Sequence, residues 1–369
     1  MRKKIRLLLI VLTGLSLTAC KNSTKEEKKA TIGVYFFDGW GGRHQYADDP
    51  NEPWAKNAPL GLSKSLLYEF SGREPLWGWR GDTQEIMERQ IDLAADHGID
   101  FFVFCWYWRD SKRAINPEAI EAASQHKSMQ FYLTAKNKNR LKYSLLVANH
   151  GGSEIEGVEN WKAAVRYWTK YFKDPQFATV DGKPLVVIFN PGGITNEDMA
   201  AMQEEAKKEG FKNGLAIAGC RPSAKQKSGF THSTNYAVAP NGYTGITEEH
   251  KYAEIVKESK QEWTGTEQQP YIPLLTSGWD KRPWDPPFPD GHGHKAGAYF
   301  PDSTPENFKN FLLDAIQWMN EHPKETTKEK VVLIYAWNEF GEGGYLAPTK
   351  ADPEAAKLKV IKETVTGKK

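Results

Sequence analysis

The stretch VVLIYAWNEFGEGG, residues 331–344, joins an apolar run to a glycine-rich loop that carries two acids. Glu339 closes the run, and Glu342 follows three residues later. A continuous apolar run is typical of a strand that is covered on both faces. In parallel α/β proteins such strands present functional side chains at their carboxyl ends. The position of the two acids therefore predicts an active site at the end of a parallel strand.

Seven other short apolar runs predict strands of the same kind. The eight runs span residues 32–37, 100–108, 143–149, 184–190, 214–220, 235–240, 271–277 and 331–339. Helical patterns separate most of them, at residues 83–97, 160–172, 197–209, 248–263 and 306–321, whereas residues 221–234 show none. An α/β protein with one (β/α)8 (TIM) barrel is therefore expected. The alternative, an open doubly wound sheet, needs a phosphate-loop spacing that residues 37–43 lack.

The amino terminus has the pattern of a targeting segment. Basic residues precede an apolar stretch too short to span a bilayer, and the stretch ends in Leu-Thr-Ala-Cys20. This resembles a bacterial lipobox, so we expect residues 1–19 to be a signal peptide and Cys20 to carry lipid. Residues 20–30 would form a tether, and residues 31–369 the catalytic barrel. The alternative is an ordinary secretory signal with a chance cysteine.

Charge and cysteine content exclude some functions. The formal net charge of +2 becomes slightly negative without the basic residues of the signal, which gives no electrostatic case for nucleic-acid binding. Cys105 and Cys220 lie in predicted strands and are expected to be buried thiols. His292 and His294 form an H-x-H pair, a weak metal signal without further acidic ligands. We therefore expect no metal and no cofactor, and a monomer.

The predicted strand ends are rich in side chains that suit sugars. Trp and Tyr offer flat apolar faces, and Asn both donates and accepts hydrogen bonds. For most of these residues packing, turn closure or, for Asp280 with Arg282, mutual pairing is an equally open interpretation. The candidate substrate-binding residues are Tyr35, Trp106, Tyr107, Trp108, Asn149, Asn190, Trp279, Asp280, Arg282, Trp337, Asn338 and Tyr345.

Two carboxyl groups at one strand end suit glycoside hydrolysis. One is held protonated to serve the leaving oxygen, and the other takes a proton or supports the developing cation. We therefore predict Glu339 and Glu342 as catalytic. The alternative is that both are ordinary loop acids, one of them capping a helix.

Several segments also carry a family resemblance. AWNEFGEGGYLAPT (336–349) resembles the W-N-E-x-x-E-G signature of glycoside hydrolase family 99 and its WbsX-like relatives. IGVYFFDGW (32–40), MERQIDLAADHGIDFFVFCWYW (87–108), SLLVANH (144–150) and TSGWDKRPW (276–284) resemble other segments of that family in the same order. The resemblance implies a barrel without a metal requirement and retaining cleavage of α-mannosidic bonds within a chain. It also implies that Glu339 deprotonates the sugar 2-hydroxyl to form an epoxide-like intermediate, while Glu342 acts as acid and then base.

Together these features predict a lipid-anchored, retaining α-glycoside hydrolase that is endo-acting on α-mannan-like or related polysaccharide. Its place would be the cell envelope, on the periplasmic or outer-surface face of a bacterial outer membrane. One alternative is a surface lipoprotein that captures oligosaccharides without cleaving them. Another is a polysaccharide-assembly enzyme, against which the lipobox argues because sugar-nucleotide donors are cytoplasmic.

Overall fold

Strand β2 (Phe101–Trp106) is buried at every position, as expected for a sheet covered on both faces. It pairs in parallel with β1 (Thr31–Phe36) and β3 (Lys142–Val147) in a computed structural model that describes residues 28–111, 113–220, 229–284 and 296–367. The strand order is β7-β6-β5-β3-β2-β1-β9-β8. The further strands are β5 (Lys183–Ile188), β6 (Ala216–Cys220), β7 (His232–Thr234), β8 (Leu274–Thr276), β9 (Val331–Tyr335) and, antiparallel to β5, β4 (Thr179–Val180).

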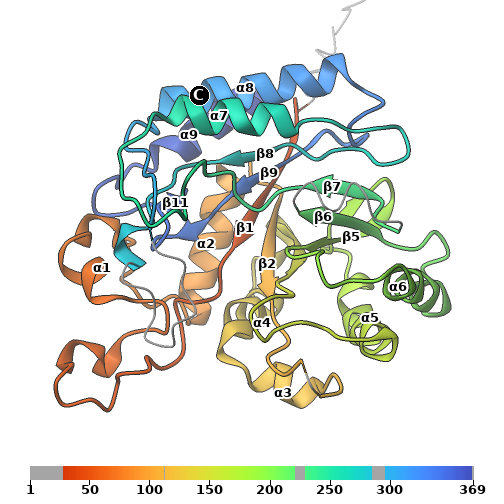
Figure 1. Cartoon of the computed structure of the whole chain (residues 1–369), viewed down its shortest axis with the longest axis horizontal. Helices are drawn as coiled ribbons and strands as arrows, with labels where there is room; N and C mark the ends of the chain where they lie inside the picture. Colours follow the sequence, from red (N-terminus) through yellow and green to blue (C-terminus); the bar gives the residue numbers. More distant parts are fainter. Residues whose placement is uncertain (1–27, 112, 221–228, 285–295, 368–369) are drawn as a thin grey trace, which may run out of the picture.

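The sheet closes on itself between β7 and β8. Ser233 and Tyr271 form a parallel bridge, and Ile272 N donates to Ser233 O at 2.8 Å. The Thr234 hydroxyl donates to Ile272 O at 2.9 Å, which adds a side-chain link to this seam. The eight parallel strands therefore form a nearly closed ring, and the predicted (β/α)8 barrel is confirmed (Figure 1).

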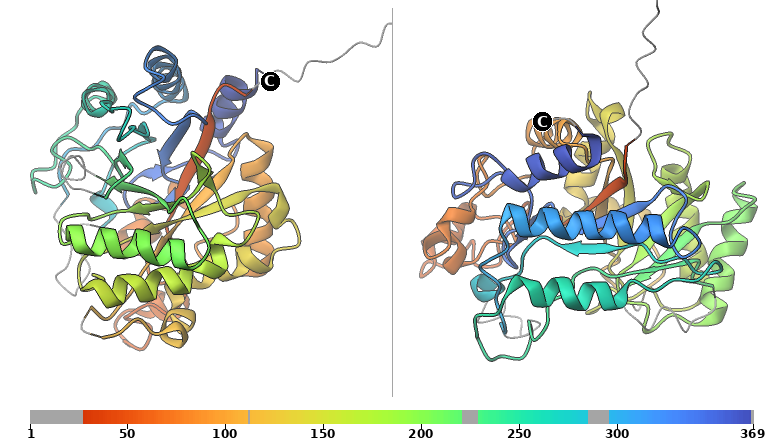
Figure 2. Two further views of the ribbon diagram at one scale, coloured as in Figure 1. Left: turned by 90° about the vertical axis from the view of Figure 1, so that its right-hand side faces the viewer. Right: turned by 90° about the horizontal axis from the view of Figure 1, so that it is seen from above.

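Helices cover the outside of this ring. Figures 1 and 2 show α7, α8 and α9 on one flank and α5 and α6 on another. The helices predicted from the sequence are present with ends shifted by a few residues, whereas α1, α3, α4 and α9 were not predicted. The helices are α1 (Lys64–Tyr68), α2 (Gln84–Asp96), α3 (Pro117–Ala122), α4 (Lys127–Thr134), α5 (Val158–Phe172), α6 (Asn196–Lys208), α7 (Tyr252–Glu262), α8 (Pro305–Glu321) and α9 (Ala356–Thr366).

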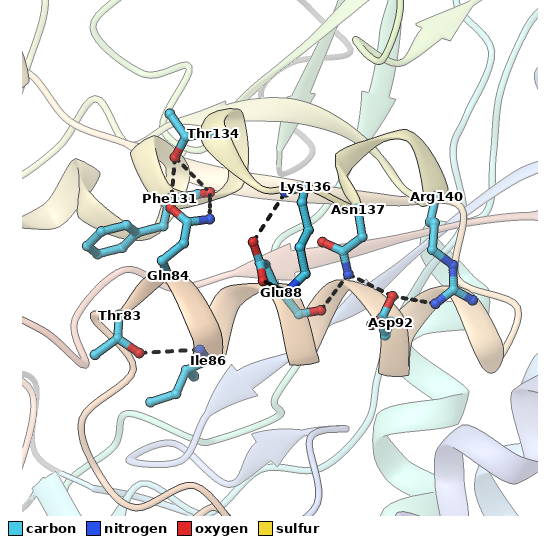
Figure 3. A network of polar contacts seen from close by, with 10 residues as sticks. All are labelled: Thr83, Gln84, Ile86, Glu88, Asp92, Phe131, Thr134, Lys136, Asn137 and Arg140. Carbon is cyan, nitrogen blue, oxygen red and sulfur yellow. Dashed lines mark hydrogen bonds and ion pairs between the residues drawn. The ribbon is translucent and has the colours of Figure 1, made fainter.

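Polar contacts fix α2 against the segment that runs from α4 to β3 (Figure 3). The Asn137 amide donates to Glu88 O at 2.8 Å and to the Asp92 carboxylate at 2.7 Å. Arg140 forms an ion pair with the same carboxylate, and Gln84 donates to Phe131 O at 2.9 Å. These acids therefore meet amide or cationic donors on the solvent side of the barrel.

Two of the eight predicted strands differ most from the structure. The sixth was predicted at residues 235–240, which is wrong, because no residue of that range lies in a strand and the observed strand, β7, pairs with β6 only through His232–Thr234. The apolar residues that follow pack over the core outside the sheet. The eighth was predicted to reach Glu339, but β9 ends at Tyr335, and Asn338–Glu339 form a separate short strand, β10. Both differences shape the site described below.

A long excursion between β1 and α2, residues 37–83, lies beside the carboxyl ends of β8 and β9. Arg73 in this excursion donates to the backbone oxygens of Asp280 and Phe340, each at 3.0 Å. It also forms an ion pair with the Asp280 carboxylate. One guanidinium therefore joins the excursion to two loops more than 200 residues away in the chain.

The remaining predictions concern cysteines and membranes. Cys105 and Cys220 are buried thiols, as predicted. Within the described ranges, no helix has the length and apolar character needed to cross a bilayer. Cys20, His292 and His294 lie outside the described residues.

Candidate active site

The two predicted catalytic acids belong to a tight hairpin that follows β9. Strand β10 (Asn338–Glu339) pairs antiparallel with β11 (Gly344–Tyr345), and the turn between them is closed by Glu342 N donating to Glu339 O at 3.2 Å. Gly343 has a φ of +77°, a conformation that favours glycine. The glycines therefore allow the chain to fold back so that both acids lie at one strand end.

Gly341 has a packing role in the same hairpin. A Cβ at this position would lie 2.0 Å from Cε2 of Trp284, far inside van der Waals contact. The Trp284 ring thus lies directly on the backbone between the two acids. Its indole nitrogen donates to Gly61 O at 3.1 Å, which links the ring to the excursion that follows β1.

The two acids line a cavity of about 500 Å³ at the carboxyl ends of the strands. A second cavity, of about 450 Å³, lies between α4 and α5 and away from these strand ends. The strand-end cavity is lined by aromatic, polar and basic side chains, as is usual for a small-ligand site. Its lining includes Phe37, Gln45, Tyr107, Arg109, Gln125, His150, Ser153, Phe189, Tyr236, Tyr243, Lys281, Trp284, Glu339 and Glu342.

The Glu339 carboxylate is only half satisfied. Its residue is 3% exposed, and the Tyr236 hydroxyl donates to Oε1 at 2.5 Å. Oε2 is buried and has no hydrogen-bond partner among the residues that the structure describes. A buried oxygen of this kind costs free energy unless a ligand or a proton satisfies it.

Glu342 has a matching tyrosine. The Tyr335 hydroxyl, at the end of β9, donates to its Oε2 at 2.5 Å. The rings of Tyr236 and Tyr335 meet edge to face with centroids 5.0 Å apart, so each fixes the other. Lys281 supplies a nearby positive charge and is itself buried.

The environment raises the pKa of both carboxyls. Burial and the negative charge of Glu342 raise the pKa of Glu339 well above its usual range, against a smaller opposing effect of the Tyr236 hydrogen bond. Burial also raises the pKa of Glu342, while the Tyr335 hydrogen bond and Lys281 oppose the rise. Because the two carboxyls lie close together, ionisation of Glu342 further raises the pKa of Glu339.

The predicted sugar-binding residues divide into those at the cavity and those around it. Tyr107 lines the cavity, with the Arg109 guanidinium over its ring. Trp106 is fully buried and packs edge to face on Trp168 at 5.1 Å. Trp108 is also buried and borders a smaller cavity of about 190 Å³ behind Arg109.

The two predicted asparagines close turns. Asn149 has a φ of +48°, donates to Asn190 O at 2.9 Å and accepts from Ile155 N. Asn190 accepts from Gly192 N at 3.1 Å. Both side chains thus bond to backbone groups, which agrees with the alternative interpretation that these asparagines close turns.

Other predicted residues hold the loops in place. Asp280 pairs with Arg282, as one interpretation expected, and the Arg282 guanidinium lies 3.6 Å from the centre of the Tyr299 ring. Asn338 exchanges two hydrogen bonds with the backbone of Phe37, which joins the ends of β1 and β10.

The last four lie within or beside the core. The Trp337 indole donates to Gln90 at 2.7 Å. The Tyr35 hydroxyl donates to Asn235 O at 2.9 Å, and the buried Trp279 ring packs against Tyr335. Tyr345 pairs with Asn338 in the hairpin and contacts the ring of Phe340.

The cavity residues that were not among the predicted site residues include Tyr236, Lys281, Arg109 and Trp284. The signal for Lys281 and Trp284 was present, because both stand beside predicted residues in the segment GWDKRPW. Tyr236 lay inside a predicted strand, so its position beyond the end of β7 was not visible. Among the described residues, no group of three or more His, Cys, Asp or Glu side chains is placed to hold a metal ion.

Solved structures with a similar fold include two of the GH99 endo-α-mannosidase from Bacteroides thetaiotaomicron, one of them in complex with bis-tris-propane. Each is 14% identical, covers 92% of this chain and 97% of its own, and gives a TM-score of 0.57. A glycoside hydrolase-like protein gives the same identity and TM-score, with 92% and 95% covered. At this identity the likeness establishes the barrel fold.

Two curated relatives, both described as uncharacterized protein WxcX, come from two strains of Xanthomonas campestris pv. campestris. Each is 19% identical over 291 residues, which cover 72% of this chain and 39% of the relative. The chain thus spans about two fifths of the length of these relatives. A family model described as "Glycosyltransferase WbsX" matches residues 79–360, most of the barrel including the hairpin. The chain therefore belongs to the WbsX family.

Proposed function

We propose that the protein is a retaining α-glycoside hydrolase in which Glu339 and Glu342 perform the chemistry. The observation that carries this proposal is the hairpin itself. It holds one buried and one half-buried carboxyl at one cavity, each accepting a hydrogen bond from a tyrosine, and leaves Oε2 of Glu339 without a partner among the described residues. A carboxyl pair that shares a proton supplies an acid and a base at the same pH.

The roles follow the family resemblance. Glu339 would take the proton of the sugar 2-hydroxyl, whose oxygen attacks the anomeric carbon as the glycosidic bond breaks and Glu342 protonates the leaving oxygen. Glu342 would then take a proton from the water that opens the epoxide-like intermediate at the anomeric carbon. Lys281 favours the negative charge on Glu342 and therefore the proton on Glu339. A substrate hydroxyl that donates to Oε2 of Glu339 stabilises that carboxylate and favours the opposite arrangement. Substrate binding would thus place the proton where the reaction needs it.

The proposed substrate is an α-linked polysaccharide, cut within the chain. Support comes from the GH99 endo-α-mannosidase with the same barrel fold and from the W-N-E-x-x-E-G segment. The cavity volume of about 500 Å³ accommodates a small number of sugar units rather than a long chain segment.

The test is product release from α-mannans and other α-linked glycans by the unmodified protein, by Glu339→Gln and by Glu342→Gln. Each variant should lose on the order of 10²–10⁴ in kcat, since each removes one proton-transfer group. Proton NMR of the first product should show retained anomeric configuration. Activity that survives both substitutions would refute the site assignment.

A second candidate is transfer of the glycosyl unit to a sugar acceptor instead of water, which the description of the family favours. Both reactions need the same two carboxyls, so the acceptor distinguishes them. Incubation with donor and acceptor oligosaccharides should give only shorter products for a hydrolase and longer ones for a transferase. Binding without any turnover would favour the capture lipoprotein.

We also propose that the barrel is tethered to the cell envelope through lipid on Cys20 and residues 20–30. The supporting pattern is the apolar stretch that ends in Leu-Thr-Ala-Cys. Fractionation of cells that express the full chain should place it with membranes, and Cys20→Ser should release it. An unchanged distribution would contradict the proposal.

A further inference from the structure

The ionisable side chains in the described wall of the strand-end cavity include three basic residues besides the two glutamates. Arg109, His150 and Lys281 line it, and within the described residues Glu339 and Glu342 are its only acids. These three basic residues follow three different strands, β2, β3 and β8. The basic groups are therefore spread over three strand ends of the cavity.

The two cations of the cavity have different surroundings. Lys281 lies beside Glu342, and its positive charge opposes the rise in the pKa of that carboxyl that burial causes. Arg109, which follows β2, is the second permanent cation of the cavity lining.

Arg109 is held in place without an acidic partner. Its Cζ lies 4.7 Å from the centre of the Tyr107 ring, a cation–π arrangement. His126 donates to Tyr107 O at 3.0 Å and fixes that residue from behind. Arg109 forms no ion pair with a described residue, because its neighbour Asp110 pairs with Arg113 at 3.0 Å. The guanidinium edge therefore stays available at the cavity.

We propose that Arg109 binds an anionic substituent, a carboxylate or a sulfate ester, on the glycan, so that the preferred substrate is an acidic polysaccharide. A guanidinium presents paired donors that match the oxygens of either group. In the ring of strands, β1 separates the end of β2, which carries Arg109, from the end of β9, which carries the glutamates. The charged sugar unit would thus occupy a subsite beside the cleaved bond. This inference rests on the proposed function, because it concerns the substrate of the same cavity.

The test measures binding to the full barrel that carries Glu339→Gln, which should suppress turnover while Glu342 stays beside Lys281. Two matched pairs of probes separate the two anions. Polygalacturonate oligosaccharides are compared with their carboxyl-reduced forms, and chemically sulfated α-mannan oligosaccharides with unsulfated ones. We expect at least one acidic form to bind about tenfold to a hundredfold tighter than its neutral partner at low salt. The preference should shrink as salt rises.

Adding Arg109→Gln should abolish the preference, Arg109→Lys should keep part of it, and Arg113→Gln should leave it unchanged. Equal binding of acidic and neutral forms, failure of every acidic form to bind, or a preference that survives Arg109→Gln would overturn the inference. Failure of the proposed function is a different result. An acidic glycan that binds through Arg109 but is never cleaved by the unmodified protein would contradict hydrolysis alone.

Discussion

Asp92 on α2 and Glu342 in the hairpin after β9 both sit in hydrogen-bonded surroundings, yet their pKa values move in opposite directions. The Asn137 amide, and with it Arg140, lowers the pKa of Asp92, whose side chain is 48% exposed. Burial raises the pKa of Glu342 although a tyrosine and a lysine oppose it. The helix layer thus uses charges that water and cations already stabilise, whereas the hairpin holds charges that are costly to form. Reactive acids are expected where the fold withholds such stabilisation.

The largest loss of activity is expected from a change in the shape of the hairpin that carries Glu339 and Glu342. Gly341→Ala places a methyl group 2.0 Å from the Trp284 ring, so the ring or the hairpin must move. We expect a loss on the order of 10² in kcat, since a displacement of about 1 Å at catalytic groups has that effect. Unfolding free energy should fall by about 1–3 kcal/mol. Activity assays and urea unfolding measure both. Gly193→Ala is the control, because a Cβ there meets nothing within 4 Å. Full activity of Gly341→Ala would show that this packing is dispensable.

The next largest effect is expected from the two tyrosine hydroxyls that donate to the glutamates of the hairpin. Tyr335→Phe and Tyr236→Phe each remove the hydroxyl that donates to one glutamate. We expect kcat to fall roughly 10- to 100-fold, the size of a hydrogen bond to a charged group. The pH–rate profile should move to higher pH, because each hydroxyl lowers the pKa of its carboxyl. Tyr171→Phe in α5 removes a hydroxyl far from the cavity and should change neither quantity. An unshifted profile in both hairpin variants would contradict the coupling.

Lys281 should affect pH dependence more than maximal rate. Its ammonium lowers the pKa of Glu342, so Lys281→Met should raise that pKa and shift the profile towards alkaline pH. Lys136, which pairs with Glu88 on α2, is the matched lysine of the helix layer, and Lys136→Met should leave the profile in place. A shift towards acidic pH in Lys281→Met would show that the ammonium does not act on this carboxyl.

The free energy of unfolding should fall as pH rises and Glu339 ionises, because its carboxylate is buried. The folded pKa of Glu339 lies above its unfolded value, so its contribution to stability is present at low pH and is lost as pH rises through the folded pKa. Glu339→Gln removes this loss and should be more stable than the unmodified protein by roughly 1 kcal/mol or more at pH 8. Urea unfolding at pH 5 and pH 8 tests this. Equal stability at both pH values would mean that the carboxyl pair is not strained.

Asp92→Asn should give the smallest effect, with the opposite sign. The folded pKa of Asp92 is depressed, so its stabilisation is present above the unfolded value near 4 and is lost as pH falls. Because the pair with Arg140 is exposed, we expect a loss of roughly 0.5 kcal/mol at neutral pH and unchanged kcat. A large loss of activity would show that α2 is coupled to the mouth of the barrel.

The strands and the acids were predictable because they obey local rules. Residues 331–335 are apolar at every position, which predicts a strand. Glu339 follows this run closely, so it is expected at the carboxyl end of the strand. The tyrosine donors obey no such rule. Tyr335 reads as one more buried strand residue, and its contact with Glu342 exists only because the hairpin folds back on the strand. Tyr236 reaches Glu339 because β7 stops after three residues, which depends on pairing with β6. Contacts of this kind arise from tertiary structure and leave no periodic signal.

The guanidinium of Arg73 has a consequence for recombination between relatives. It holds carbonyl groups of Asp280 and Phe340, so the excursion after β1 and the loops after β8 and β9 share one fastening point. A chimera that takes only the catalytic hairpin from a relative would lack the matching Arg73 contacts that hold this hairpin in place. The transferable unit of specificity in this barrel is therefore a trio of loops, and Arg73 and Asp280 must travel together with the hairpin.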